Sequence, residues 1–389
     1  MEVTQIYMLM NSISQEVLGK TDLVQEDLTG IVDMGTEVFN QNAIDNYVKS
    51  LVNHIGKVVF VNRPYSGKVP SVLMDAWEFG SVMEKISADV PKATENDTWN
   101  LKDGQEYKQD VFHKPTVTAK FFNSKVTFEV PVSITERQVK ESFSSAAQLN
   151  GFLSMIYNAV EKSMTIKTDA LIMRTINNMV AETLDADNAA FGGKTVDYST
   201  ASTVRCVNLL HLYNEATGLN LKADVAILTP DFIRFAAYQM GLYADRLGSI
   251  STLFNIGGKE RFTPKDALHT VLLSDFAKAA QAYLYADTFH SEQVLLPKAE
   301  TVPSWQATGK DYAFANVSKI DVKSASGAVI SIGGVLGVMF DRDALGVTNL
   351  DKRVTTNYNA KAEFFNNYYK FDAAYFNDAN ENFVVFFIA

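Results

Sequence analysis

Apolar residues recur three and four positions apart through the middle of the chain, from residue 145 to residue 183. This spacing puts the apolar side chains on one face of an α-helix. At about 1.5 Å per residue, one helix of that length spans roughly 58 Å, several times the usual globular helix. We predict a single structural spine helix. The alternative is two shorter helices, broken near Gly151 or near Thr165 and Ile166.

The first 56 residues carry weaker helical patterns, at residues 12–18, 23–28 and 42–55. The third of these has its apolar residues at regular helical spacing, whereas the first two are only weakly amphipathic. We interpret residues 1–56 as an arm with short helices and little core of its own.

Residues 57–132 have a different character. Segments 58–61, 116–121 and 125–130 are β-rich or alternate between apolar and polar residues, which is typical of strands. Residues 87–110, between them, are polar and charged. A long two-stranded ribbon is marginally stable alone in water. We therefore predict an extended β loop that lies against another surface.

The region from residue 185 to residue 334 alternates between helical and strand patterns. It predicts a loop at 185–199, a helix at 203–216, a strand at 223–228 and a helix from Pro230 to Leu242. Thr229 is placed as the N-cap of the last helix, with Pro230 at its first position. The further predicted strands are at 270–273, 282–285 and 294–296. This is the pattern of a mixed α/β domain.

The last sixty residues predict strands and turns. Residues 328–340 are continuously apolar, and further strand patterns lie at 349–357 and 383–388. Aromatic residues are frequent after Asn357. We expect a closing sheet that is buried against the spine helix.

Composition narrows the class of protein. The chain has 389 residues, 47% of them hydrophobic and 21% charged, which fits a globular protein of about two or three domains. Thirty-five Lys and Arg against 45 Asp and Glu leave a net charge of -10, so tight, sequence-reading DNA binding is not expected. Cys206 is the only cysteine, which excludes an intrachain disulfide and suits a reducing compartment. The N-terminus shows no basic leader, and no segment reaches 18 consecutive apolar residues, so we expect a soluble cytoplasmic product that keeps its own start.

Motifs for metal and phosphate chemistry are incomplete. The five histidines lie far apart and form no HExxH pattern, so a catalytic zinc site is not expected. Residues 192–195 imitate the end of a phosphate-binding loop, but Asn188 stands where that motif needs glycine, and we favour a glycine turn. Residues 185–187 resemble the start of an EF-hand, but Ala190 occupies its glycine position. No metal and no cofactor are predicted.

Three further features have a structural interpretation. Asp341 and Asp343 flank Arg342, which we interpret as a solvated turn rather than an acid/base pair. Cys206, on the apolar side of the predicted helix 203–216, is interpreted as a core residue and not a nucleophile. The glycines at 333, 334 and 337 indicate close backbone contacts in a buried strand.

No active site emerges, while the arm, the extended loop and the spine helix point to a building block. Such parts expose backbone and apolar surface that must find partners. Neighbouring subunits of a repeating assembly supply those partners.

The order of these parts resembles the major capsid protein of tailed bacteriophages, whose fold also occurs in herpesvirus shells and encapsulins. Locally, NQNAIDNYVKSLVNHIGKVVF (residues 40–60) is similar to the entry into the extended loop. Residues 111–143 and 149–164 are similar to the loop exit and spine helix in small short-tailed phages of Gram-positive hosts. GVMFDRDALGVTN (residues 337–349) resembles a strand and turn late in these proteins. The resemblance covers nearly the whole chain through diffuse patterns.

The resemblance implies an α+β fold with four parts: an arm (1–56), an extended β loop (57–132), a peripheral domain (133–184 and 335–389) and an axial domain (185–334). It implies a structural protein, not an enzyme, which self-assembles as hexamers and pentamers into an icosahedral shell around packaged double-stranded DNA. The alternatives are an encapsulin-type compartment or another phage structural protein.

The resemblance also implies partners and a place in the cell. The expected partners are further copies of the chain, a scaffolding protein, a portal and DNA contacted non-specifically, with no membrane and no small-molecule substrate. The expected location is the virion, after assembly in the host bacterial cytoplasm. Because the extended loop already begins near Lys57, we expect a separate scaffolding protein rather than a cleaved N-terminal segment.

Candidate inter-subunit contacts lie in the polar middle of the extended loop. We assign Trp99, Lys102, Asp103 and Tyr107 to this role. Some family members form Lys-to-Asn crosslinks beside a carboxylate. Lys102, Asn100 and Glu106 lie in the loop but do not align with a crosslinking motif, so we interpret them as solvated residues.

Overall fold

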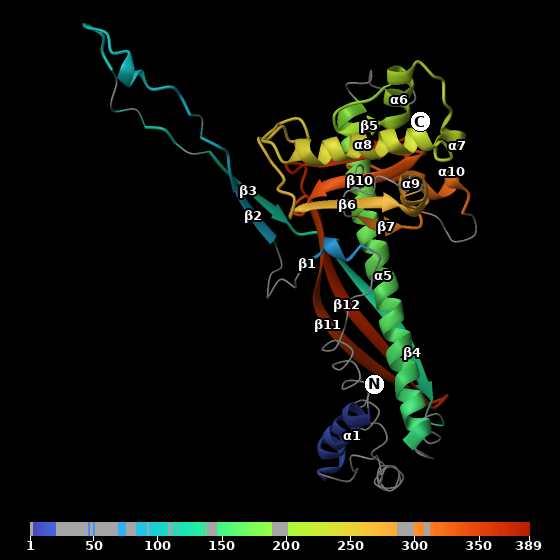
Figure 1. The fold of residues 1–389 in the computed structure, drawn as a ribbon. Coiled ribbons are helices and arrows are strands. Elements are labelled where there is room, and N and C mark those ends of the chain that lie inside the picture. The colour runs from blue at the N-terminus through green and yellow to red at the C-terminus, as the bar shows by residue number, and fades with distance from the viewer. Residues whose placement is uncertain are drawn as a thin grey trace. The chain divides into compact units, whose positions relative to one another are not determined.

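The computed structural model (Figure 1) describes residues 3–20, 46, 50, 69–74, 83–91, 93–107, 110, 112–114, 116–135, 137, 146–188, 201–285, 299–306 and 312–389. The chain forms two compact units. Unit 1 comprises Met1–Glu78, Lys125–Ile172 and Val347–Ala374, and unit 2 comprises Phe79–Ser124, Met173–Gly346 and Tyr375–Ala389.

One uninterrupted helix, α5 (Ala146–Asn188), confirms the predicted spine helix, so the two-helix alternative is wrong. No proline interrupts it, and a single glycine is tolerated within so long a helix. Helix α5 continues to Asn188, into the segment predicted as a loop at 185–199. Its last turn is held by Arg205, whose Nε donates to Asp187 Oδ1 at 3.0 Å. The rest of that loop lies outside the described residues.

Unit 1 contains a four-stranded sheet in the order β1 (Leu73–Met74), β11 (Leu345–Asn359), β12 (Phe364–Asn377) and β4 (Lys125–Thr135). β1, which follows the short helix η1 (Pro70–Val72), pairs parallel to β11, and β4 pairs antiparallel to β12. The strands predicted at 125–130 and 349–357 are confirmed, and both are longer than predicted.

The arm is described in part. Helix α1 (Val3–Leu18) contains the predicted helix 12–18 and begins nine residues earlier. Residues 23–28 and 58–61 lie outside the described residues, as does 42–55 apart from two single positions.

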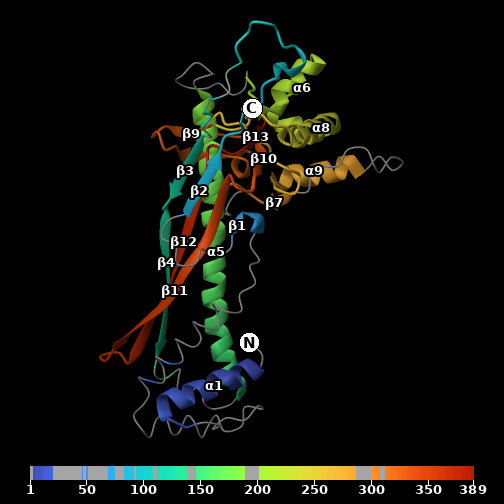
Figure 2. The ribbon, with the colours of Figure 1, turned by 90° about the vertical axis from the view of Figure 1, so that its left-hand side faces the viewer.

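Unit 2 contains a five-stranded sheet in the order β5 (Cys206–Asn208), β13 (Phe383–Phe387), β10 (Val335–Asp341), β6 (Leu268–Leu273) and β7 (Glu300–Val302). Helices α6 (Leu209–Thr217), α8 (Pro230–Leu247) and α9 (Ser274–Tyr285) pack together on this sheet (Figure 2). Every residue of β10 is buried, as its apolar run predicts. The strands predicted at 270–273 and 383–388 are confirmed.

Two predicted strands of unit 2 are wrong, and the predicted helix 203–216 is confirmed only from Leu209 onward. The helix at 203–216 begins only at Leu209, because Cys206–Asn208 pairs with β13 and the Asn208 side chain caps the helix by accepting from the His211 N–H. The segment 223–228 forms a short helix, α7 (Ala223–Ala226), and 282–285 ends α9. Short apolar runs fit either a strand or a buried helix, and tertiary packing decides between them. Residues 294–296 lie outside the described residues.

The start of α8 confirms the prediction of Thr229 at the N-cap and Pro230 at the first position. The Thr229 hydroxyl donates to the Val225 carbonyl at 3.0 Å instead of capping α8, which continues beyond Leu242 to Leu247. A four-residue helix, α10 (Phe314–Val317), follows later in the unit.

The apolar run 328–340 forms two strands, β9 (Val329–Ile332) and β10, and β9 pairs with β8 (Ile320–Lys323). Gly334 separates them with φ of 69°, and a Cβ there would lie 1.9 Å from the Ile388 carbonyl oxygen. A Cβ on Gly337 would lie 2.5 Å from Leu272 Cδ2. The predicted close backbone contacts are confirmed at Gly334 and Gly337 but not at Gly333, where a Cβ would meet nothing within 4 Å.

Candidate assembly interface

A β-hairpin in unit 2 carries the candidate interface. Strand β2 (Met83–Ala88) pairs antiparallel with β3 (Val117–Phe122), which confirms the strand predicted at 116–121. The ladder continues into the loop, where the Asp89 N–H donates to the Thr116 carbonyl at 2.9 Å. The segment between the two strands forms the long loop seen beyond β2 and β3 in Figure 1.

The two faces of this hairpin are reversed relative to a usual half-buried sheet. The outer face is exposed and mostly apolar, and it comprises Glu84, Ile86, Ala88, Val117, Ala119 and Phe121. The inner face is partly buried and mostly polar, and it comprises Met83, Lys85, Ser87, Thr118, Lys120 and Phe122. An antiparallel sheet with one wet face normally turns its apolar side to the core. The hairpin therefore presents apolar surface to whatever lies outside the subunit.

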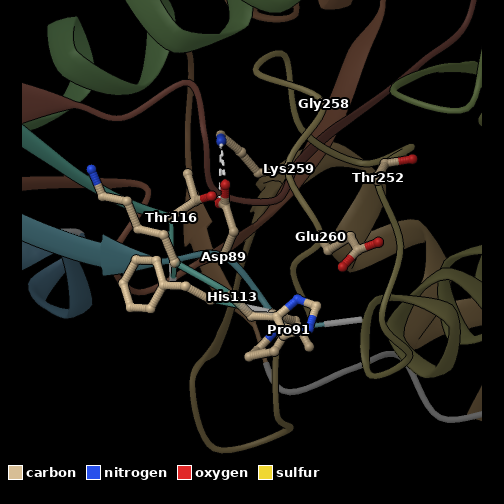
Figure 3. Close-up of a pocket in the computed structure, with 11 residues that line it drawn as sticks. Asp89, Pro91, His113, Thr116, Thr252, Gly258, Lys259 and Glu260 are labelled. Atoms are coloured by element: carbon tan, nitrogen blue, oxygen red, sulfur yellow. Dashed lines mark hydrogen bonds and ion pairs between the residues drawn. The ribbon is translucent and has the colours of Figure 1, made fainter. Parts of the chain in front are cut away.

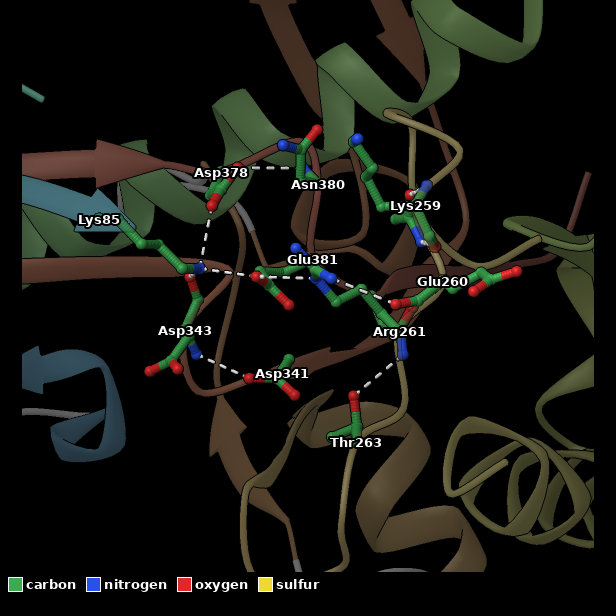
Figure 4. Close-up of polar contacts among 12 residues, drawn as sticks. Lys85, Lys259, Glu260, Arg261, Thr263, Asp341, Asp343, Asp378, Asn380 and Glu381 are labelled. Carbon is green, nitrogen blue, oxygen red and sulfur yellow. Dashed lines mark hydrogen bonds and ion pairs between the residues drawn. The ribbon is translucent and has the colours of Figure 1, made fainter. Parts of the chain in front are cut away.

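A cluster of charged residues, the clasp, holds the inner face (Figure 4). Lys85 Nζ lies 2.9 Å from Asp378 Oδ2 and 2.8 Å from Glu381 Oε1. Lys120 Nζ lies 2.8 Å from Asp378 Oδ1, so one carboxylate binds both strands. Arg261 Nε lies 3.4 Å from Glu381 and extends the cluster to a third segment of unit 2. We name these five residues the clasp.

The clasp shifts the pKa values of Lys85 and Asp378 toward their charged forms. Burial by itself would lower the pKa of Lys85, but the hydrogen bonds and charges of Glu381 and Asp378 raise it above its ordinary value. Burial would raise the pKa of Asp378, but hydrogen bonds from Lys120, Lys85 and the Asn380 N–H lower it. Both groups are therefore charged at neutral pH.

Apolar and ionic contacts secure the hairpin on either side of the clasp. The Phe122 ring packs on the Phe376 ring with 5.1 Å between centroids. At the root of the loop, Lys259 Nζ lies 3.0 Å from Asp89 Oδ2 (Figure 3). A cavity of about 750 Å³ opens there, lined by residues 89–91, 112–114 and Thr116 of the hairpin root and by Thr252 and residues 258–260.

The tip of the loop contains the residues predicted for inter-subunit contact. Trp99 ends the short helix η2 (Asp97–Trp99), and its side chain is 94% exposed. The Lys102 N–H donates to Tyr107 Oη at 3.0 Å, so these two residues are brought together, while Asp103 lies between them and is exposed. Their role in contacts stays a prediction.

The tip residues could be predicted from the sequence, whereas the outer face and the clasp could not. Residues 85–88 (KISA) and 118–121 (TAKF) alternate between polar and apolar side chains. Such a pattern normally predicts that the apolar side chains face the protein interior. Asp378 and Glu381 come from the run N-D-A-N-E-N, which carries no recognisable motif.

The other candidate residues have structural roles. Cys206 lies in β5 rather than in a helix, and burial raises the pKa of its thiol, so its assignment to the core is confirmed. The Asp343 N–H donates to Asp341 Oδ1 at 2.9 Å in the predicted turn, although Asp341 is buried rather than solvated. Asp185 accepts hydrogen bonds from the Ser324 and Ser326 hydroxyls.

Among the described residues, no cluster of His, Cys, Asp and Glu is placed to hold a metal ion. In the same part of the chain, no helix is both long enough and apolar enough to cross a membrane. Residues 192–195 lie outside the described residues.

Comparison with known proteins identifies a family that matches nearly the whole chain. The family model for the Phi29-like phage major capsid protein matches residues 10–387. The major capsid protein of Bacillus phage B103 is 23% identical over 187 residues, which cover 47% of this chain and 40% of that relative.

Among solved structures, a chain in the capsid of Staphylococcus phage Andhra has a TM-score of 0.50 at 10% identity. The superposition covers 84% of this chain and 86% of that chain, and it supports the fold. Because the family model matches almost from end to end, this chain belongs to the Phi29-like phage major capsid protein family.

Proposed function

We propose that the chain self-assembles, as hexamers and pentamers, into an icosahedral head shell that encloses packaged double-stranded DNA. The observation that carries the proposal is the reversed hairpin. The clasp fixes its polar face to the subunit, and its apolar face, with Ile86, Val117 and Phe121 all more than half exposed, is left for a neighbour. In a monomer this arrangement does not contribute to stability, because the large apolar side chains of the outer face stay exposed to water.

The extended loop then lies on an adjacent copy. Trp99, Lys102, Asp103 and Tyr107 contribute contacts at its tip, and the outer face contributes contacts along its strands. The peripheral domain (133–184 and 335–389) carries the spine helix, the axial domain (185–334) lies at the five-fold and six-fold centres, and the arm (1–56) reaches neighbouring copies. The length of α5 supports this assignment.

A separate scaffolding protein and a portal complete the assembly, which takes place in the host bacterial cytoplasm. The net charge of -10 supports weak, non-specific contact with DNA that must be packed and later released. The chain acts as a structural component and not as an enzyme. The family match favours the phage shell over an encapsulin-type compartment.

Electron microscopy of the full chain, expressed alone and with its candidate scaffolding protein, tests the proposal. We expect closed, uniform icosahedral particles. Small oligomers under both conditions would overturn the shell assignment.

A loop variant tests the role of the tip. Replacement of residues 93–107 by a short Gly-Ser linker keeps the Asp89–Thr116 hydrogen bond and the clasp. This variant should fold with an unchanged thermal transition and form no closed shells. Normal shells from it would show that the tip is not needed.

A further inference from the structure

A second exposed apolar surface lies in unit 2, in the loop between α8 and β6. Ile250, Leu253 and Phe262 are 59%, 60% and 53% exposed. We name these three residues the loop patch. Single exposed apolar residues are common, but three large ones on one loop are not.

Backbone pairing aligns two members of the loop patch. Ser251 and Arg261 exchange both of their backbone hydrogen bonds, at 2.9 and 3.1 Å. Ile250 and Phe262 flank the same end of this isolated antiparallel bridge, since Ile250 precedes Ser251 and Phe262 follows Arg261, and both side chains are more than half exposed. The Arg261 side chain turns inward to Glu381, so its sequence neighbour Phe262 turns outward. The charged side chain is inside and the apolar ones are outside, as on the hairpin.

The loop is held firmly, so its exposed side chains are not the result of a loose segment. The Asn255 side chain accepts from the Lys259 N–H at 2.8 Å and donates to the Lys259 carbonyl at 2.7 Å. The Phe383 N–H of β13 donates to the Phe254 carbonyl at 2.9 Å, and the Phe254 side chain is buried. A preorganised apolar surface binds a partner without a large ordering cost.

The loop patch adjoins the hairpin. Thr252 and residues 258–260 of this loop line the same cavity of about 750 Å³ as the hairpin root, and the ion pair between Asp89 and Lys259 joins its two sides (Figure 3). Val90 and Phe112, both exposed, extend the apolar surface of the hairpin toward this cavity. Both surfaces are also held through Glu381, which pairs with Lys85 and Arg261.

We propose that the loop patch packs against a second copy of this chain, as part of the same interface as the outer face of the hairpin. The inference rests on the proposed function, because that function supplies the second copy. Continuity between the two surfaces favours this partner over an unrelated protein. An apolar, aromatic centre beside a polar cavity rim is the composition that protein interfaces show.

Thiol labelling tests this inference directly. Cys206 is the only cysteine and is fully buried, so Leu253→Cys introduces the one accessible thiol. A small maleimide should label this variant quickly in free subunits and at least tenfold more slowly in assembled particles. Disassembly of the same particles should restore fast labelling, which controls for damage to the thiol. Equal labelling of free subunits and particles would overturn the inference.

A second variant gives an independent readout. Ile250→Ser combined with Phe262→Ser should leave the circular dichroism and thermal transition of the free subunit unchanged and lower the yield of closed particles at least tenfold. A normal yield would overturn the inference.

The labelling experiment also separates the possible failures. Protection of the introduced thiol only while scaffolding protein is present would overturn the inference, because the scaffold would then be the partner. If the unmodified chain forms no particles, the proposed function fails and the inference fails with it. If particles form and the introduced thiol stays reactive in them, only the inference fails.

Discussion

The ammonium group of Lys85, on the hairpin, lies 2.9 Å from the carboxylate of Asp378, near the other end of the chain. The same carboxylate lies 2.8 Å from Lys120 on the paired strand. A single buried aspartate thus holds both strands of the hairpin by their polar face. This relationship explains how the subunit keeps apolar side chains outside without losing the hairpin from its surface.

Removal of this charge should weaken the attachment. Asp378→Asn leaves Lys120 without its carboxylate partner and Lys85 with Glu381 alone, and we expect a loss of about 1–3 kcal/mol in the free energy of unfolding. The amides of β2 and β3 should also exchange hydrogen faster. Urea unfolding and hydrogen exchange measure the two effects. Asp343→Asn is the matched control, because that side chain is 53% exposed and its loss should cost within about 0.5 kcal/mol. Equal effects of the two variants would contradict the clasp.

The contribution of Asp378 should depend on pH with a definite sign. Its pKa in the folded chain lies below the ordinary value of 3.8, so the folded state binds fewer protons than the unfolded state as pH falls. Its stabilisation is therefore present above pH 3.8 and is lost as pH falls through the folded pKa. We expect the stability difference between the unmodified chain and Asp378→Asn to shrink in this acid range. Urea midpoints at several pH values measure it, and a constant difference at every pH would contradict the assignment.

Helices and strands whose position in the fold depends on a clear apolar pattern could be predicted from the sequence. The spacing of Ile156, Val160 and Met164 identifies the buried face of α5. The apolar run of β10 is typical of a strand in the middle of a sheet, where both of its faces are buried. In contrast, residues 223–228 are too short a run for periodicity to separate a helix from a strand.

The orientation of the hairpin could not be predicted for a different reason. Alternation in a strand shows that two faces differ, but not which one lies against the body. That choice depends on Asp378 and Glu381, which reach the hairpin only through tertiary structure. For the proposed interface, the sequence pattern alone would therefore predict that the apolar face lies inward, which is the reverse of the orientation in the structure.

Gly334 and Gly333 should respond very differently to the same substitution. At Gly334 an alanine would require φ of 69° and a Cβ 1.9 Å from the Ile388 carbonyl oxygen, so the backbone must move. We expect Gly334→Ala to cost about 3 kcal/mol or more. A Cβ on Gly333 meets nothing within 4 Å, so Gly333→Ala should stay within about 0.5 kcal/mol. Thermal unfolding of both variants checks this, and similar values would contradict the close approach.

Tyr369 should tolerate the loss of its hydroxyl. The side chain is fully buried, burial raises its pKa, and its hydroxyl has no hydrogen-bond partner among the described residues. A buried hydroxyl without a partner costs free energy, so Tyr369→Phe should raise the free energy of unfolding by up to about 1 kcal/mol. Chemical denaturation measures the change. A loss of more than about 1 kcal/mol would mean that the hydroxyl is bonded in solution.

Phe121 and Phe122 are adjacent in β3 but lie on opposite faces of the hairpin. Substitutions at the two positions can therefore distinguish an effect on folding from an effect on assembly. The Phe122 ring packs on Phe376, so Phe122→Ser should lower the free energy of unfolding by about 1–3 kcal/mol. Phe121 is 65% exposed, so Phe121→Ser should change the stability of the subunit by within about 0.5 kcal/mol. In assembly we expect the opposite order, because we propose that a neighbouring copy covers the outer face. Sedimentation should then show fewer closed particles for Phe121→Ser even though its subunit is stable, and full assembly of this variant would exclude the outer face from the interface.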